Sequence, residues 1–301
     1  MYDPGHDIWY YLGDLPTDLL TSDMAIHAMP NGENIYVAGG YNENYQASSA
    51  AFTIDVERTL ELFNQNPENK NQLVISKLAS MNEKRGGINA VAFSRYIFVS
   101  GGYTHEDTFC KPYQTVERYD IANNTWSQVA GLSTPRANIG LVRCGDVFLA
   151  VGGDTRSSCT SESESKSIPV DVVEIYTPLD GLSAAWKNVP IEPMDGRMRF
   201  AASPWPETSS ILLFGGIING PAGCNCYFAS DKVLIVSQVE KIVHRANVFL
   251  YISGATVALV SCWLCRCWIR KKSKQQRNLR DANGAADEQS ETGIMLQGSV
   301  S

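Results

Sequence analysis

The chain has 301 residues with 32 acidic and 25 basic side chains, and its formal net charge is −7. This length allows one large repeat domain or two ordinary domains. The acidic balance argues against a nucleic-acid-binding protein, because neutralising phosphates requires a basic face.

Four predicted strands each end on a pair of glycines. In chain order, the pairs are Gly39-Gly40, Gly101-Gly102, Gly152-Gly153 and Gly215-Gly216. Successive pairs lie 62, 51 and 63 residues apart. Internal similarity at a period of roughly 50 residues is typical of propellers and arrays. We therefore expect mutually similar units, in which glycine permits a sharp turn and close backbone approach.

The second unit shows the full plan of one repeat. Strands are predicted at residues 85–93, 96–100, 115–120 and 125–129. Four short strands in succession predict one blade of a β-propeller. The third unit repeats this plan, whereas the first and the last lack a Trp in their fourth strand.

An ordered set of residues recurs in these units. An Arg precedes the first strand, the glycine pair ends the second, Val-Glu-x-Tyr forms the third, and a Trp lies in the fourth. This set resembles the kelch repeat family over about residues 9–236. The resemblance implies an all-β, kelch-type β-propeller with about four recognisable blades across residues 1–240, with aromatic side chains filling the space between blades. Besides the eight glycines, the blade-structural residues are then Tyr119, Trp126, Tyr176 and Trp186.

The N-terminal end offers a way to close the array. Trp9 stands 30 residues before Gly39, much as Trp186 stands 29 residues before Gly215. Trp9 is therefore predicted to lie in a fourth strand that completes the last blade and leaves no exposed edge. The alternative is that whole blades precede this sequence, and the spacing does not decide between the two.

A membrane-spanning helix is predicted at residues 246–269. The run 248–265 carries no charged side chain, and its length is close to the ~20 apolar residues that a spanning helix needs. A buried core helix is the alternative for this run. Basic residues crowd into positions 266–280, which predicts a cytoplasmic flank, with the N-terminal region outside the cytoplasm. Residues 270–301 are expected to form a basic juxtamembrane segment and a disordered cytoplasmic tail.

Export of a large N-terminal region normally requires a signal peptide, and the first residues show none. We therefore expect an N-terminally incomplete chain. The alternative is a tail-anchored protein whose propeller faces the cytoplasm.

Three cysteines fall at equivalent loop positions after their glycine pairs, namely Cys110, Cys159 and Cys224. Loops of neighbouring blades lie side by side, so disulfides among these residues are expected in an oxidising compartment. Unpaired thiols in a reducing cytoplasm are the alternative.

Two further kinds of modification are predicted. Asn123 begins an Asn-Asn-Thr sequon in a turn between strands, where a glycan could be attached. Palmitoylation is expected at three cysteines beside the predicted spanning helix, Cys262, Cys265 and Cys267. Structural cysteines and metal ligands are the alternatives for this last group.

No catalytic motif is found in the sequence. The four histidines are scattered over separate units, at positions 6, 27, 105 and 244, and neither a zinc signature nor a nucleophile elbow is present. We therefore expect no enzyme activity, no catalytic residue, no metal site and no cofactor. The copper radical oxidases, whose catalytic domain is also kelch-like, are the enzymatic alternative, but their ligand set cannot be mapped onto this sequence.

The sequence thus favours a membrane-anchored, non-enzymatic module that binds a protein or a glycan through its loops. The alternative is a cytoplasmic, membrane-tethered kelch scaffold. Four arginines recur ahead of the first strands, at positions 85, 136, 197 and 199. They could form a basic ring around the centre, or each could hydrogen-bond backbone across blades, which we favour.

Overall fold

The computed structural model describes residues 1–19, 21–29, 32–69, 71–104, 112–156, 166–178, 184–189, 195–205, 210–220 and 226–236. The chain divides into two compact units, Met1–Ala246 and Asn247–Ser301. All described residues belong to the first unit.

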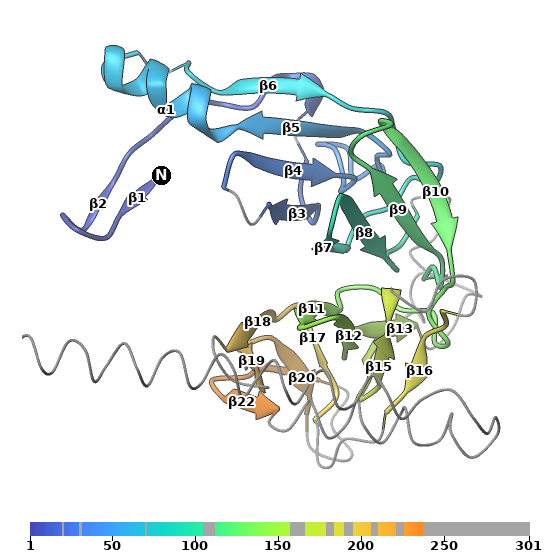
Figure 1. Ribbon diagram of the computed structural model, residues 1–301. Coiled ribbons are helices and arrows are strands. Elements are labelled where there is room, and N and C mark those ends of the chain that lie inside the picture. The colour runs from blue at the N-terminus through green and yellow to red at the C-terminus, as the bar shows by residue number, and fades with distance from the viewer. Residues whose placement is uncertain are drawn as a thin grey trace, which may run out of the picture. The chain divides into compact units, whose positions relative to one another are not determined.

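Four antiparallel sheets form the body of this unit, and we number them in chain order (Figure 1). Sheet 1 consists of β3 (Ala25–Ala28), β4 (Asn34–Ala38), β5 (Ala51–Asp55) and β6 (Val74–Lys77). Sheet 2 consists of β7 (Asn89–Phe93), β8 (Tyr96–Ser100), β9 (Val116–Asp120) and β10 (Thr125–Val129). Sheet 3 consists of β11 (Gly140–Cys144), β12 (Val147–Val151), β15 (Val173–Tyr176) and β16 (Lys187–Asn188). Sheet 4 consists of β18 (Ala201–Trp205), β19 (Ser210–Phe214) and β22 (Val233–Val236).

Smaller elements precede these strands or lie in the connections between them. They are the hairpin of β1 (Tyr2–Asp3) and β2 (Ile8–Trp9), the hairpin of β13 (Asp154–Arg156) and β14 (Ser167–Pro169), and the small sheet of β17 (Arg197–Met198), β20 (Ile217–Asn219) and β21 (Tyr227–Ala229). A short 3₁₀ helix covers Thr17–Leu19.

One α-helix, α1 (Val56–Gln65), connects β5 to β6. Asp55 starts it as an N-cap, because its carboxylate accepts a hydrogen bond of 2.8 Å from the backbone N–H of Arg58. The sequence analysis did not predict this helix.

The hydrophobic core lies between successive sheets. The first strands contact one another in the order β3, β7, β11, β18. Between sheets 2 and 3, Phe98 and Phe148 pack together with Tyr176 and Trp186. Leu149 faces sheet 4 instead and joins Leu213 in the next cluster. Each fully buried apolar side chain of this kind contributes roughly 1.5–3 kcal/mol. Because sheets 2 and 3 have neighbours on both faces, β12 is buried at every position.

The predicted closure of the array by the N-terminal strand is wrong. Trp9 lies in β2, which pairs with β1, and its side chain is 78% exposed. Its ring packs on Tyr2, with the ring centroids 5.0 Å apart. Sheet 4 holds only β18, β19 and β22 among the described residues. The spacing of Trp9 matched a pattern, but residue counts do not determine which strands pair.

The predicted fold class is also corrected with respect to the membrane. No helix within the described residues is long and apolar enough to cross a bilayer, and residues 246–269, where we placed one, lie outside them. The tail predicted at 270–301 lies outside them as well. What the structure shows is an all-β fold of propeller-like sheets.

Candidate binding site

The glycine pairs end the second strand of each sheet, where neighbouring sheets approach one another closely. Both members of each pair have positive φ, for example +65° at Gly101 and +96° at Gly102. A Cβ atom on Gly101 would lie 2.2 Å from the carbonyl oxygen of Arg136 in the next sheet. That same carbonyl accepts a hydrogen bond of 3.1 Å from the N–H of Gly102. Only glycine therefore fits here, and the contact determines where the following loop begins.

The arginines at positions 85 and 136 are structural, and each side chain bonds within its own sheet. Arg136 is fully buried and donates to Glu174 at 2.9 Å and to the carbonyl of Ala150 at 2.9 Å. Arg85 is fully buried too, and donates to Glu117 at 3.1 Å and to the carbonyl of Gly101 at 2.8 Å.

This geometry differs from the expected bonding across sheets, because these arginines bond to the preceding sheet and its connections through backbone groups and not through their side chains. Burial lowers the pKa of the Arg85 guanidinium, and the negative charge of Glu117 opposes that effect. A fully buried, paired guanidinium is not available to a ligand, so residues 85 and 136 do not form a basic ring.

The last sheet departs from this plan. Arg197 is buried and donates to the carbonyls of Gly215 and Lys232. It forms no salt bridge within the described residues, although the negative charge of Asp195 acts on it. Two of its guanidinium nitrogens, Nε and Nη2, have no hydrogen-bond acceptor there. Arg199 is exposed and lines a pocket described below.

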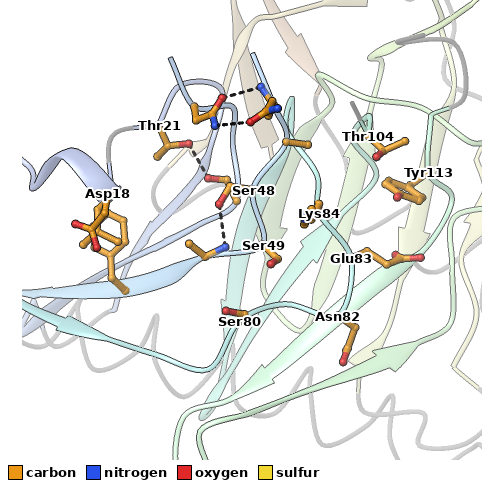
Figure 2. A pocket seen from close by; sticks show the side chains of 17 residues that line it. Asp18, Thr21, Ser48, Ser49, Ser80, Asn82, Glu83, Lys84, Thr104 and Tyr113 are labelled. Atoms are coloured by element: carbon orange, nitrogen blue, oxygen red, sulfur yellow. Dashed lines mark hydrogen bonds between the residues drawn. The ribbon is translucent and has the colours of Figure 1, made fainter. Parts of the chain in front are cut away.

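A pocket with a volume of about 740 Å³ lies between sheets 1 and 2. Figure 2 shows that its walls come from the loop after Gly39-Gly40, from the connection between β6 and β7, and from Thr104 and Tyr113 of sheet 2. The lining is mainly polar and includes Thr21, Ser48, Ser49, Ser80, Asn82 and Lys84.

The first wall of this pocket is held rigid by its own hydrogen bonds. Thr21 donates to the carbonyl of Gly39 at 2.7 Å. The Asn42 side chain accepts from the N–H of Gln46 at 2.8 Å, and the amide of Asn42 donates to the Gln46 side chain at 3.1 Å. Ser48 accepts from the N–H of Ala50 at 3.0 Å. These bonds fix the loop in one conformation before any ligand arrives.

The charged groups of the pocket are mostly compensated. Asp18 pairs with Lys77 at 2.5 Å, and Glu83 pairs with the buried Arg85. Lys84, by contrast, is exposed and forms no salt bridge within the described residues. Figure 2 shows Lys84 lying between Ser49 and Tyr113. The described lining of the pocket thus offers one lysine without a salt bridge among hydroxyl and amide groups.

A second, smaller pocket of about 240 Å³ lies beside the first strands. Its base is a chain of four residues with positive φ, linked by backbone hydrogen bonds from sheet to sheet: Asp23, Gly87, Asn138 and Arg199. Tyr103 projects into this pocket and donates to Asp154 at 2.9 Å. Burial raises the pKa of the Tyr103 hydroxyl above its usual value, so it remains a neutral hydrogen-bonding group.

The aromatic residues identified from the sequence lie between sheets. Tyr119 and Trp126 pack at 5.1 Å between ring centroids, and so do Tyr176 and Trp186. Each tryptophan also donates its indole N–H to a carbonyl at the end of the preceding sheet, Ala79 for Trp126 and Ala130 for Trp186. They belong to the core and not to a site.

The predicted modification sites are mostly not covered by the structure. Asn123 is exposed in the turn between β9 and β10. Six cysteines lie outside the described residues: Cys110, Cys159, Cys224, Cys262, Cys265 and Cys267. Cys226, which we did not single out, is disulfide-bonded.

No group of three or more His, Cys, Asp or Glu that could hold a metal occurs within the described residues. His27 belongs to β3, and His6 is exposed, whereas positions 105 and 244 lie outside the described part.

Comparison with known proteins agrees with this geometry. Residues 84–133, which cover sheet 2 and the arginine–glutamate pair at its start, match the Kelch motif. This segment is a kelch repeat. Over 118 residues, which are 39% of its length, the whole chain is 28% identical to the influenza virus NS1A-binding protein homolog of Xenopus laevis. The match spans only 17% of that protein's length.

The fold is similar to the solved structure of YjhT, with a TM-score of 0.53 at 14% identity, over 71% of this chain and 68% of that one. Together these findings support a kelch-repeat family and a β-propeller-like fold. They lend no support to membrane anchoring, and they do not favour a copper radical oxidase.

Proposed function

We propose that this kelch-repeat domain is a non-enzymatic protein-binding module, and that a peptide segment of its partner enters the pocket between sheets 1 and 2. The single observation that carries the proposal is the pocket itself. Its volume of about 740 Å³ lies within the range of roughly 300–1,000 Å³ that is usual for ligand sites.

The chemistry of the lining supports a peptide. Backbone amides and carbonyls of an extended segment need both donors and acceptors, and the hydroxyls of Ser49, Ser80 and Thr104 can supply either. Tyr113 adds an aromatic surface of the kind enriched at protein interfaces. The pre-formed loop after Gly39-Gly40 keeps the entropic cost of binding low.

The frog relative also bears on this proposal, because its name refers to binding of another protein, NS1A. That comparison covers a small part of the frog protein, so it supports the class of function and not the partner.

The test is a selection from a random-peptide display library on the full chain. We expect one family of related peptides to be enriched. The Ser49→Trp variant fills the pocket and should weaken binding of these peptides at least ~10-fold, or about 1.4 kcal/mol. Gln128→Trp, on the exposed part of β10, is the matched control and should bind as the wild type does.

Two outcomes would overturn the proposal. One is equal binding of the peptides by the Ser49→Trp and Gln128→Trp variants. The other is a failure to enrich any peptide, together with reproducible binding to a glycan array.

A further inference from the structure

Sheet 4 exposes a face that has the composition of a protein core. Register places Phe214 opposite Val233 and Leu212 opposite Ile235, so these four side chains lie on one side of the sheet. We call this surface the open face. Phe214 is 40% exposed, and Val233 and Ile235 are each 54% exposed. A contiguous exposed apolar surface of this kind usually marks an interaction site.

The equivalent face of sheet 3 is completely covered. Aligning the strands on their glycine pairs makes Leu149, Val151, Val173 and Ile175 the counterparts of the open face. None of these four side chains is more than 4% exposed. Ile211, Leu213 and Val236, on the inward side of sheet 4, share a core cluster with them.

The glycine pair of sheet 4 gives an independent sign of the missing neighbour. A Cβ atom on Gly215 would meet nothing closer than 3.7 Å, whereas one on Gly152 would lie 2.5 Å from the carbonyl of Arg197. Among the described residues, nothing takes the place at Gly215 that the carbonyl of Arg197 takes at Gly152. The open face is therefore a repeat interface without its second half.

The corresponding face of sheet 1 is accessible only at its β3 edge, because Val37 and Phe52 on this face are buried, at 4% and 2% exposed. By the same alignment, the inward residues of sheet 4 correspond to Ile35, Val37, Phe52 and Ile54. Leu15 and Leu19 pack on part of this face. Ile26, the cross-strand partner of Val37, remains 50% exposed.

We propose that the open face binds sheet 1 of a second copy of this chain, head to tail. The contact continues the packing already present between sheets 3 and 4, in which one apolar sheet face meets the opposite face of the next sheet. The two faces do not cover each other within one chain, because Ile26 and Ile235 are both half exposed. A heterologous contact of this kind uses both ends of each copy and can close on itself with two copies.

The test uses sedimentation of the purified full chain and its variants at micromolar concentration. The wild type should sediment as two copies or a larger head-to-tail species. Ile235→Asp and Ile26→Asp place a charge on one face each, and each variant alone should be monomeric. Ile168→Asp, at a residue of β14 that is 38% exposed, is the matched control and should associate as the wild type does.

Mixing the two variants is the decisive step. An equimolar mixture of Ile235→Asp and Ile26→Asp retains one intact pair of faces, so two-copy species should reappear. A monomeric wild type would overturn the proposal, and so would a mixture that stays monomeric. Unchanged circular dichroism of each variant shows that loss of association does not reflect unfolding.

Discussion

Sheets 2 and 4 both use a buried arginine to donate a hydrogen bond to the carbonyl of the first glycine, but they differ in how the charge of that arginine is compensated. In sheet 2 the buried Arg85 donates to the carbonyl of Gly101 and is paired with Glu117. In sheet 4, Arg197 donates to the carbonyl of Gly215 but forms no salt bridge among the described residues. The position of the glutamate is taken there by Leu234.

Sheet 1 shows which part of the arrangement is indispensable. It has neither the arginine nor the glutamate at the equivalent positions, and Thr21 donates to the carbonyl of Gly39 in place of the arginine. Sheets 1, 2 and 4 share a donor for the carbonyl of the first glycine, because a buried carbonyl without one costs about 1–3 kcal/mol. In sheets 2 and 3 the carboxylate adds compensation for the buried charge of the guanidinium.

The largest expected effect comes from breaking the enclosed pair in sheet 3. Glu174→Leu leaves Arg136 as an uncompensated buried charge, and we expect it to lower the free energy of unfolding by about 3–5 kcal/mol. The double variant Arg136→Met with Glu174→Leu removes both charges, so its free energy of unfolding should fall clearly less than that of Glu174→Leu alone. Arg197→Met in sheet 4 breaks hydrogen bonds but no ion pair, and should cost about 1–2 kcal/mol.

Urea unfolding followed by tryptophan fluorescence measures all three variants. If the double variant were as unstable as Glu174→Leu alone, the uncompensated charge of Arg136 could not be the cause of the instability. In that case, the shape of the two side chains, and not their charge, would dominate at this site.

Substitutions in the glycine pairs of sheets 2 and 4 should have smaller effects on stability, and these effects should also differ between the two sheets. Ala at position 215 must adopt a φ of +62° but makes only an ordinary contact, at 3.7 Å from the carbonyl oxygen of Ser230, so Gly215→Ala should cost about 1–2 kcal/mol. Ala at position 101 has the same strain and also overlaps the carbonyl of Arg136, which adds roughly 1–3 kcal/mol. Thermal unfolding of the two variants gives the difference, and equal costs would mean that the sheets can separate slightly without loss.

Local signals in the sequence were sufficient for the complete sheets. The predicted strands at 96–100 and 125–129 coincide with β8 and β10, because alternating apolar residues and glycine punctuation depend only on near neighbours. The kelch motif is likewise a local pattern. The helix α1 was not predicted, although Asp55 is an ordinary N-cap.

The candidate site could not be predicted in the same way. Its walls come from Ser49, Lys84 and Tyr113, and only the packing of sheet 1 against sheet 2 brings these residues together. The prediction that Trp9 completes the last sheet was wrong for a related reason. Its spacing matched Trp186, but strand pairing is decided by long-range contacts, and β2 pairs with the nearby β1 instead.

The smallest expected effect concerns the contact between sheets 1 and 2, where a histidine takes the place of an apolar residue. His27 in β3 corresponds to Val91 in β7. Burial lowers the pKa of His27, and the positive charge of Arg143 lowers it further.

The unfolded chain therefore takes up a proton at His27 more readily than the folded chain does. This residue's contribution to stability is complete above the unfolded pKa of about 6.5 and is lost as the pH falls below that value. His27→Gln removes the ionisation, so urea unfolding at pH 7.5 and pH 5.5 should show a smaller loss of stability on acidification than in the wild type. An equal loss of stability in the two proteins would mean that a group other than His27 is acid-sensitive. The contact between sheets 1 and 2 would then respond to pH no more than the apolar contacts between the later sheets.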